Sequence, residues 1–96
     1  MKKQELSAEK GNNVVVTVVS QKGTCAAGHK VGDQVVYEGL SLKGYLCPSA
    51  FAVLYRYIYA MKFGAKFPFG DKEKGTIKIA CPDADNPVVF ELRTEK

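Results

Sequence analysis

The fold of this chain is decided by residues 47–64, which read CPSAFAVLYRYIYAMKFG. Apolar side chains recur in this stretch at intervals of three and four residues, which is the spacing of one helix face. They are Phe51, Leu54, Tyr55, Ile58 and Met61, with a second apolar flank at Ala50, Val53, Tyr57 and Ala60. Proline suits the first helical position, because its missing N–H would be unpaired there anyway. The stretch therefore predicts a largely buried helix that begins at Pro48, has Cys47 as its N-cap, and ends near Phe63 with Gly64 at C′.

Four strands are predicted around this helix, two before it and two after it. Residues 14–20 are almost entirely β-branched and predict a buried central strand. The other strands are expected at 34–38, 76–81 and 88–93, separated by loops at 21–33, 39–46 and 65–75 and a turn at 82–87. Alternation places Ile77, Ile79 and Cys81 on one face, and Val88, Phe90 and Leu92 inward. The order β-β-α-β-β predicts an α+β fold, a single small domain with about four strands packed against one main helix.

The length and the N-terminal residues limit the organisation of the chain. Its 96 residues make one domain. We expect a flexible polar tail at 1–13 and a single α+β domain at 14–96. Lys2 and Lys3 are not followed by the apolar segment of a signal peptide, and no apolar run reaches membrane-spanning length. The sequence therefore predicts a cytoplasmic protein without membrane association, in which thiols stay reduced.

The basic residues are scattered along the chain, although the net charge is +4. Only residues 62–67, KFGAKF, interleave cations with aromatic side chains. A nucleic-acid footprint is usually clustered, so binding of nucleic acid is not expected. No residue is assigned a catalytic role, and a binding function is favoured over an enzymatic one.

The chemistry-bearing residues are three cysteines and the only histidine: Cys25, His29, Cys47 and Cys81. Because three is an odd number, a disulfide framework would leave one cysteine over. Three thiolates and one imidazole complete a tetrahedral site for zinc, and soft sulfur also suits copper(I) or iron. The sequence therefore predicts a metal site, most simply zinc, with these four residues as ligands. Asp33 is near enough along the chain to orient His29 through its second ring nitrogen.

The order of elements brings two of these ligands to one end of the domain. A helix from Cys47 carries the chain about 24 Å in one direction, and the strand ending at Cys81 carries it about 20 Å back. Cys25 and His29 join them if the first strand runs toward the same end. The loop 39–46 must then return across the domain and would be nearly taut, because eight residues reach about 26–29 Å.

Three other interpretations remain open. The cysteines can be small buried side chains, and Cys81 fits that role because it alternates with Ile77 and Ile79. Alternatively, the protein is a thiol redox or small-ligand-binding protein with Cys47 as the activated thiol, since a helix N-terminus stabilises a thiolate. A third possibility is an interaction module that presents Phe67, Pro68 and Phe69 to a partner.

Several blocks of the sequence together resemble a family of small uncharacterised bacterial and archaeal proteins. These blocks are GTCAAGHKVGD at 23–33, LCPSAF at 46–51 and ACPDADNPVVFEL at 80–92. The resemblance covers nearly everything after residue 13. Arg56 stands where the family usually has proline, which favours a more regular helix, and Phe69 stands where a tryptophan is frequent. The resemblance groups the motifs and implies no activity.

Overall fold

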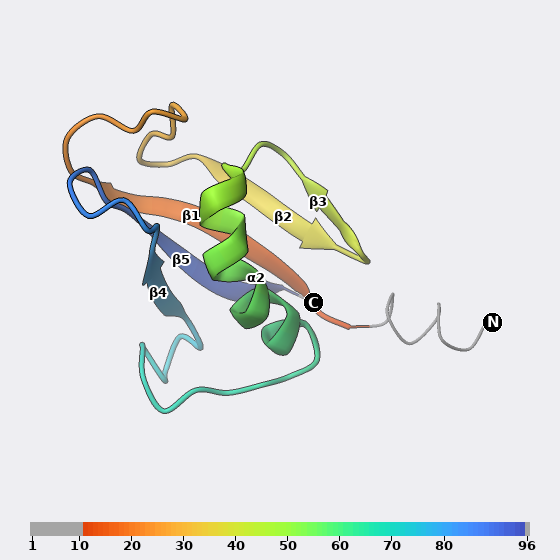
Figure 1. The fold of residues 1–96 in the computed structure, drawn as a ribbon. Coiled ribbons are helices and arrows are strands. Elements are labelled where there is room, and N and C mark those ends of the chain that lie inside the picture. The colour runs from red at the N-terminus through yellow and green to blue at the C-terminus, as the bar shows by residue number, and fades with distance from the viewer. Residues whose placement is uncertain (1–10, 96) are drawn as a thin grey trace.

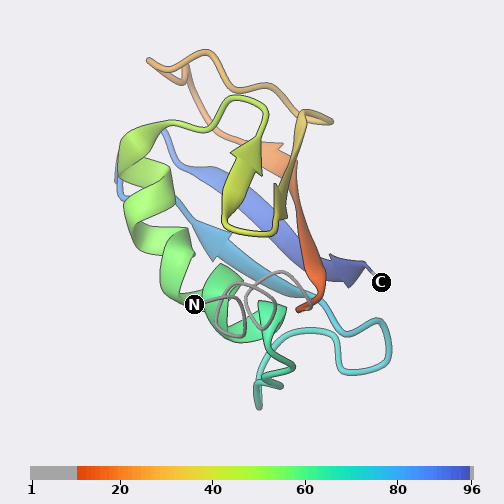
Figure 2. The ribbon, with the colours of Figure 1, turned by 90° about the vertical axis from the view of Figure 1, so that its right-hand side faces the viewer.

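The computed structural model describes residues 11–95 and has an α+β fold. Its helix, α2 (Pro48–Lys62), lies against one face of an antiparallel sheet (Figures 1 and 2). The strands are β1 (Asn13–Gln21), β2 (Gln34–Glu38), β3 (Ser41–Lys43), β4 (Ile77–Ala80) and β5 (Val88–Glu95). Within the predicted tail, residues 1–10 lie outside the described part of the chain. Residues 11–13 belong to the fold, because the Asn12 amide donates a 2.7 Å hydrogen bond to the Lys62 carbonyl and Asn13 begins β1.

The strand order in the sheet is β3-β2-β1-β5-β4, and every pair of neighbours is antiparallel. The residues of β1 that face α2 are Val14, Val16 and Val18, and all three are buried. Their counterparts on β5, Val88, Phe90 and Leu92, are also buried, as predicted from their alternation. The core therefore lies between α2 and the two central strands, β1 and β5.

The segment 39–46, predicted as a loop, contains the short strand β3. Ser41, Leu42 and Lys43 pair with the end of β2 in antiparallel register. A strand of three residues is too short to leave a period in the sequence. Because β3 runs antiparallel to β2, it carries the chain back toward the N-terminus of α2, which is the return that the predicted loop had to make.

The ends of α2 follow the sequence prediction. Cys47 is the N-cap and proline occupies the first helical position, while the Cys47 side chain makes no capping hydrogen bond. At the other end the Gly64 amide donates to Met61 O (3.0 Å) and the Ala65 amide to Ala60 O (3.0 Å). These are the two hydrogen bonds of a Schellman motif, and Gly64 adopts the left-handed conformation that the motif requires (φ +91°).

The buried face of α2 is narrower than predicted. Leu54, Ile58 and Met61 are in the core, whereas Tyr55, expected among the buried residues, is 39% exposed. Tyr55 belongs to a row of aromatic side chains on the helix, in which the ring centroids of Tyr55 and Tyr59 are 5.7 Å apart and those of Tyr59 and Phe63 are 5.1 Å apart. The row remains accessible because the sheet covers only one side of the helix (Figure 2).

Candidate functional site

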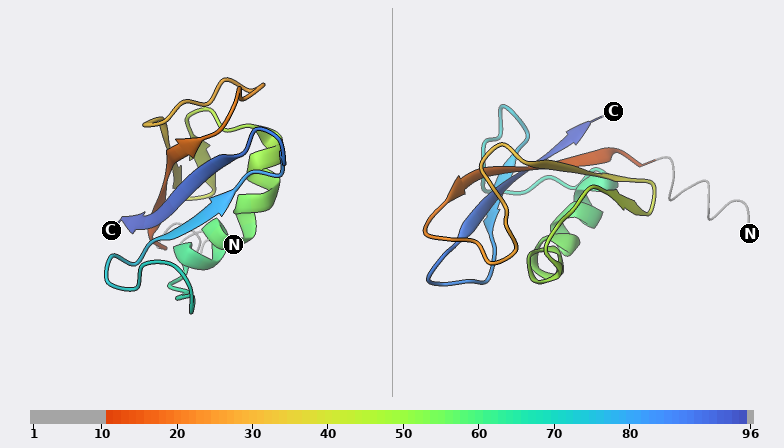
Figure 3. Two further views of the ribbon diagram at one scale, coloured as in Figure 1. Left: turned by 90° about the vertical axis from the view of Figure 1, so that its left-hand side faces the viewer. Right: turned by 90° about the horizontal axis from the view of Figure 1, so that it is seen from above.

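The strand directions bring the chemistry-bearing residues to one end of the domain. β1 and β4 both pair antiparallel with β5, so they run in the same direction. The loop after β1, which carries Cys25 and His29, therefore lies at the same end as the turn after β4, which begins at Cys81. The N-terminus of α2 reaches this end too (Figure 3). The predicted convergence required the first strand to run toward this end of the domain, and β1 does so.

These residues share one pocket, which we call the thiol pocket. It has a volume of about 320 Å³ and is lined by all three cysteines and by His29. Ala50, Val88 and Phe90 supply apolar wall, and Ser49, Asp83 and Asn86 supply polar groups. All three cysteines are free thiols with partly buried side chains. The pocket therefore combines soft nucleophilic atoms with apolar walls, at the end of the domain where α2 begins.

His29 is held in a fixed orientation beside Cys47. The Cys47 amide donates a 3.0 Å hydrogen bond to His29 Nε2. The ring stacks on Tyr45, with centroids 5.2 Å apart, and meets the edge of Phe90 at 5.6 Å. Only 4% of His29 is exposed, so the ring is fixed in the interior and is not a mobile loop side chain. Tyr45 and Phe90 were not expected at the site, because sequence spacing does not show which rings meet.

The other two loop cysteines are placed by the backbone around them. Cys81 Sγ accepts a hydrogen bond from the Val88 amide at 3.3 Å, across the turn between β4 and β5. With the Gln21 amide group oriented to suit its neighbours, Gln21 donates to His29 O (2.7 Å) and accepts from the Cys25 amide (2.8 Å). Gln21, at the end of β1, thus holds both ends of the Cys25–His29 segment.

The convergence does not assemble a metal ligand set in this conformation. Within residues 11–95, no three His, Cys, Asp or Glu side chains are placed so that they could hold a metal ion together. His29 Nε2 is already occupied by the Cys47 amide. Asp33, expected to orient His29, instead accepts a 3.0 Å hydrogen bond from the Lys30 amide, and its hydrogen bonds within the described residues do not include one to the ring. Metal binding by Cys25, His29, Cys47 and Cys81 stays a prediction.

The aromatic loop at 67–69 lies far from the thiol pocket, beyond the other end of β4. Phe67 packs against the core and meets Tyr57, with ring centroids 5.7 Å apart. Phe69 contacts the Phe67 ring (5.3 Å) and is 45% exposed. The loop therefore uses Phe67 to close the core and leaves Phe69 partly accessible. Its use as a partner surface stays a prediction.

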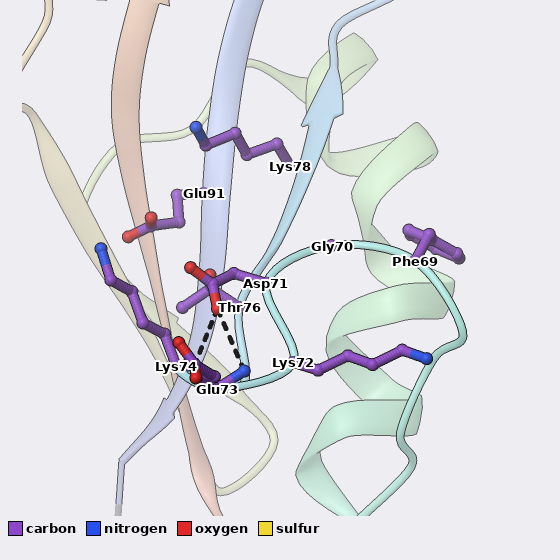
Figure 4. A pocket seen from close by; sticks show the side chains of 9 residues that line it. All are labelled: Phe69, Gly70, Asp71, Lys72, Glu73, Lys74, Thr76, Lys78 and Glu91. Atoms are coloured by element: carbon purple, nitrogen blue, oxygen red, sulfur yellow. Dashed lines mark hydrogen bonds between the residues drawn. The ribbon is translucent and has the colours of Figure 1, made fainter.

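A larger open hollow of about 800 Å³ lies around the turn that precedes β4 (Figure 4). Its charged side chains alternate in sign: Asp71, Lys72, Glu73 and Lys74 around the turn, with Lys78 and Glu91 on the strands. Asp71 Oδ1 accepts hydrogen bonds from the Glu73 amide (3.0 Å) and the Lys74 amide (3.1 Å), so its carboxylate closes the turn. Mixed exposed charges of this kind favour no particular ligand, and the thiol pocket is the better candidate site.

Comparison of the chain with protein-family models, curated proteins and solved structures finds no match. The family resemblance of the sequence blocks therefore stays a prediction. In the part of the chain that the structure describes, no helix has the length and apolar character needed to cross a membrane.

Proposed function

We propose that this protein binds a small, partly apolar molecule in the thiol pocket, with Cys47 as the activated thiol beside it. The observation that carries the proposal is the convergence of every cysteine of the chain, from three separate elements, on one pocket. Thiolates are strong nucleophiles toward soft electrophilic centres. The ligand class is therefore a small molecule that carries such a centre next to an apolar portion that fits against Ala50, Val88 and Phe90.

Cys47 is favoured over the other two cysteines by its position at the N-terminus of α2. The first hydrogen bond of the helix runs from the Phe51 amide to Cys47 O (2.8 Å). The amides of Ser49 and Ala50 come before it and therefore have no carbonyl partner within the helix. Both residues line the pocket, and the first turn contains no acidic side chain. Cys47 therefore lies at the positive end of the helix dipole, which makes it the cysteine that we propose as the reactive one, although its side chain makes no capping hydrogen bond.

The test is the alkylation rate of each cysteine in metal-free protein, measured with iodoacetamide and peptide mass spectrometry. We expect Cys47 to react about tenfold faster than Cys25 and Cys81, which corresponds to a barrier to alkylation that is lower by about 1.4 kcal/mol. Cys47→Ser should abolish the fast phase and leave the two slow ones unchanged. Equal rates at all three cysteines, or Cys47 as the slowest, would refute the assignment.

A second candidate function, favoured by the same convergence, is binding of a soft metal ion such as zinc. Side-chain rotation would have to bring the sulfurs of Cys25, Cys47 and Cys81 together, and His29 would have to release the Cys47 amide before either ring nitrogen could bind the metal. Metal analysis of protein purified without affinity metals separates the two candidates. Stoichiometric metal with all three thiols protected from alkylation supports the metal site. Metal-free protein whose thiols are alkylated freely rules it out.

A further inference from the structure

We propose that His29 is a positioning residue for Cys47, which holds the start of α2 on the thiol pocket, and that it is neither a metal ligand nor a base. The proposal deepens the proposed function and rests on it, because it states how the reacting sulfur is held in place.

The N-terminus of α2 lacks the usual means of satisfying its N-cap amide. In a capping box, a Glu or Gln at the third helical position accepts a hydrogen bond from that amide. Here the third position is Ala50, which has no acceptor. Instead, the Cys47 amide donates to Nε2 of His29, a residue that lies 18 positions earlier in the chain. His29 therefore performs across the tertiary structure the role that a nearby Glu or Gln performs in a capping box.

The ring is held for this role by its burial and by two aromatic contacts. Tyr45 stacks on one face at an interplanar angle of 28°, and Phe90 meets the ring at 85°. The backbone carbonyl of His29 is fixed in turn by the side chain of Gln21. The hydrogen bond thus joins two segments that are far apart in the sequence, the loop after β1 and the start of α2. Without it, Cys25 and Cys47 would be attached to elements that can separate.

The hydrogen bond also limits what His29 can do in chemistry. Nε2 must lack a proton in order to accept from the Cys47 amide, so the proton of the neutral ring is on Nδ1. An Nε2 atom in this bond has no lone pair left for a metal or for a proton taken from a thiol. His29 can take part in either reaction only if the start of α2 is first released.

Two variants separate the acceptor role from the shape of the ring. His29→Gln keeps an acceptor close to the position of Nε2, and His29→Phe keeps a flat ring against Tyr45 but has no acceptor. We expect hydrogen exchange of the Cys47 amide, followed by NMR, to be about tenfold faster in His29→Phe and close to the natural rate in His29→Gln. The ratio of Cys47 to Cys81 alkylation should fall in His29→Phe and recover in His29→Gln.

The opposite results overturn the proposal. Unchanged exchange in His29→Phe would show that the amide does not depend on the ring, and equal losses in both variants would show that the acceptor is not what matters. If His29→Phe does not fold, ¹⁵N NMR of the unmodified protein decides: an unprotonated Nε2 supports the proposal, and a proton on Nε2 refutes it. Should the amide results hold while the three cysteines of the unmodified protein react equally, the proposed function fails and the positioning role stands.

Discussion

The Thr24 amide donates a 3.1 Å hydrogen bond to Asn86 Oδ1, which joins the loop after β1 to the turn between β4 and β5. These are the two segments that bring Cys25 and Cys81 to the thiol pocket. The preceding residue, Gly23, has φ +71°, and a Cβ there would collide with the same Asn86 oxygen. The backbone at Gly23 therefore needs both the conformational freedom and the small size of glycine.

We predict that Gly23→Ala lowers the free energy of unfolding by about 2 kcal/mol. About half arises from the left-handed backbone conformation and half from displacing the Asn86 side chain from the Thr24 amide. Gly28→Ala is the matched control: φ is +84°, but no atom lies within 4 Å of its Cβ position, so only the conformational part should be lost. Urea denaturation measures both. In an Asn86→Ala background the two glycine substitutions should lower the free energy of unfolding by the same amount. A persisting difference between them would contradict the prediction.

Stability at alkaline pH should depend on Tyr37. Burial, followed by the neighbouring hydroxyls of Tyr55 and Tyr59, raises the pKa of Tyr37 from 10.0 to about 12. Between these values the unfolded chain loses the phenolic proton while the folded chain keeps it. The stabilising contribution is therefore complete below pH 10 and is lost as the pH rises toward 12. Tyr37→Phe should flatten this decline in urea denaturation, whereas Tyr45→Phe, at an exposed position, should not.

Lys62 has a buried side chain that should be replaceable. It is 1% exposed, and its Nζ makes no hydrogen bond to any residue within 11–95. The rings of Phe63 and Tyr37, with centroids 5.8 and 6.0 Å away, are its compensating contacts. Lys62→Met keeps the packing and removes the cost of burying an amino group that has no hydrogen-bond partner within the described residues, so it should stabilise the protein by about 1–2 kcal/mol.

The matched control for this substitution is Lys66→Met, at an exposed position, which should change the free energy of unfolding by less than about 0.5 kcal/mol. A loss of stability in Lys62→Met with no loss in Lys66→Met would show that the Lys62 ammonium is paired in solution.

The one-sided burial of α2 predicts a sharp contrast between two of its large side chains. Leu54 is fully buried, and Leu54→Ala should cost about 2–5 kcal/mol through lost apolar contacts and a residual cavity. Tyr59 is 42% exposed, so Tyr59→Ala should cost about 1 kcal/mol or less. Thermal or urea unfolding compares them directly. A large loss in Tyr59→Ala would mean that the aromatic row on α2 is covered in solution.

The elements that could be predicted from the sequence are those whose side chains repeat with a period. The helix, with Pro48 at its start and Gly64 after its end, follows from local rules of capping and spacing. Strand β1 follows from its β-branched run. Strand β3 could not be predicted, because three residues are too few to show a period. The exposure of Tyr55 could not be predicted either, because periodicity marks an apolar face of a helix without showing how much of that face is covered.

The sequence by itself determined which residues could do chemistry and which helix and strands carry them. Only the tertiary structure decided that they meet, because the direction of β1 depends on its pairing with β5, which is a contact between distant parts of the chain. The same holds for His29. As the one imidazole beside three thiols it favoured a metal ligand, whereas packing against Tyr45 and Phe90 turned its Nε2 to the Cys47 amide. The residue types limit the chemistry that is available, and long-range packing determines how each atom is used.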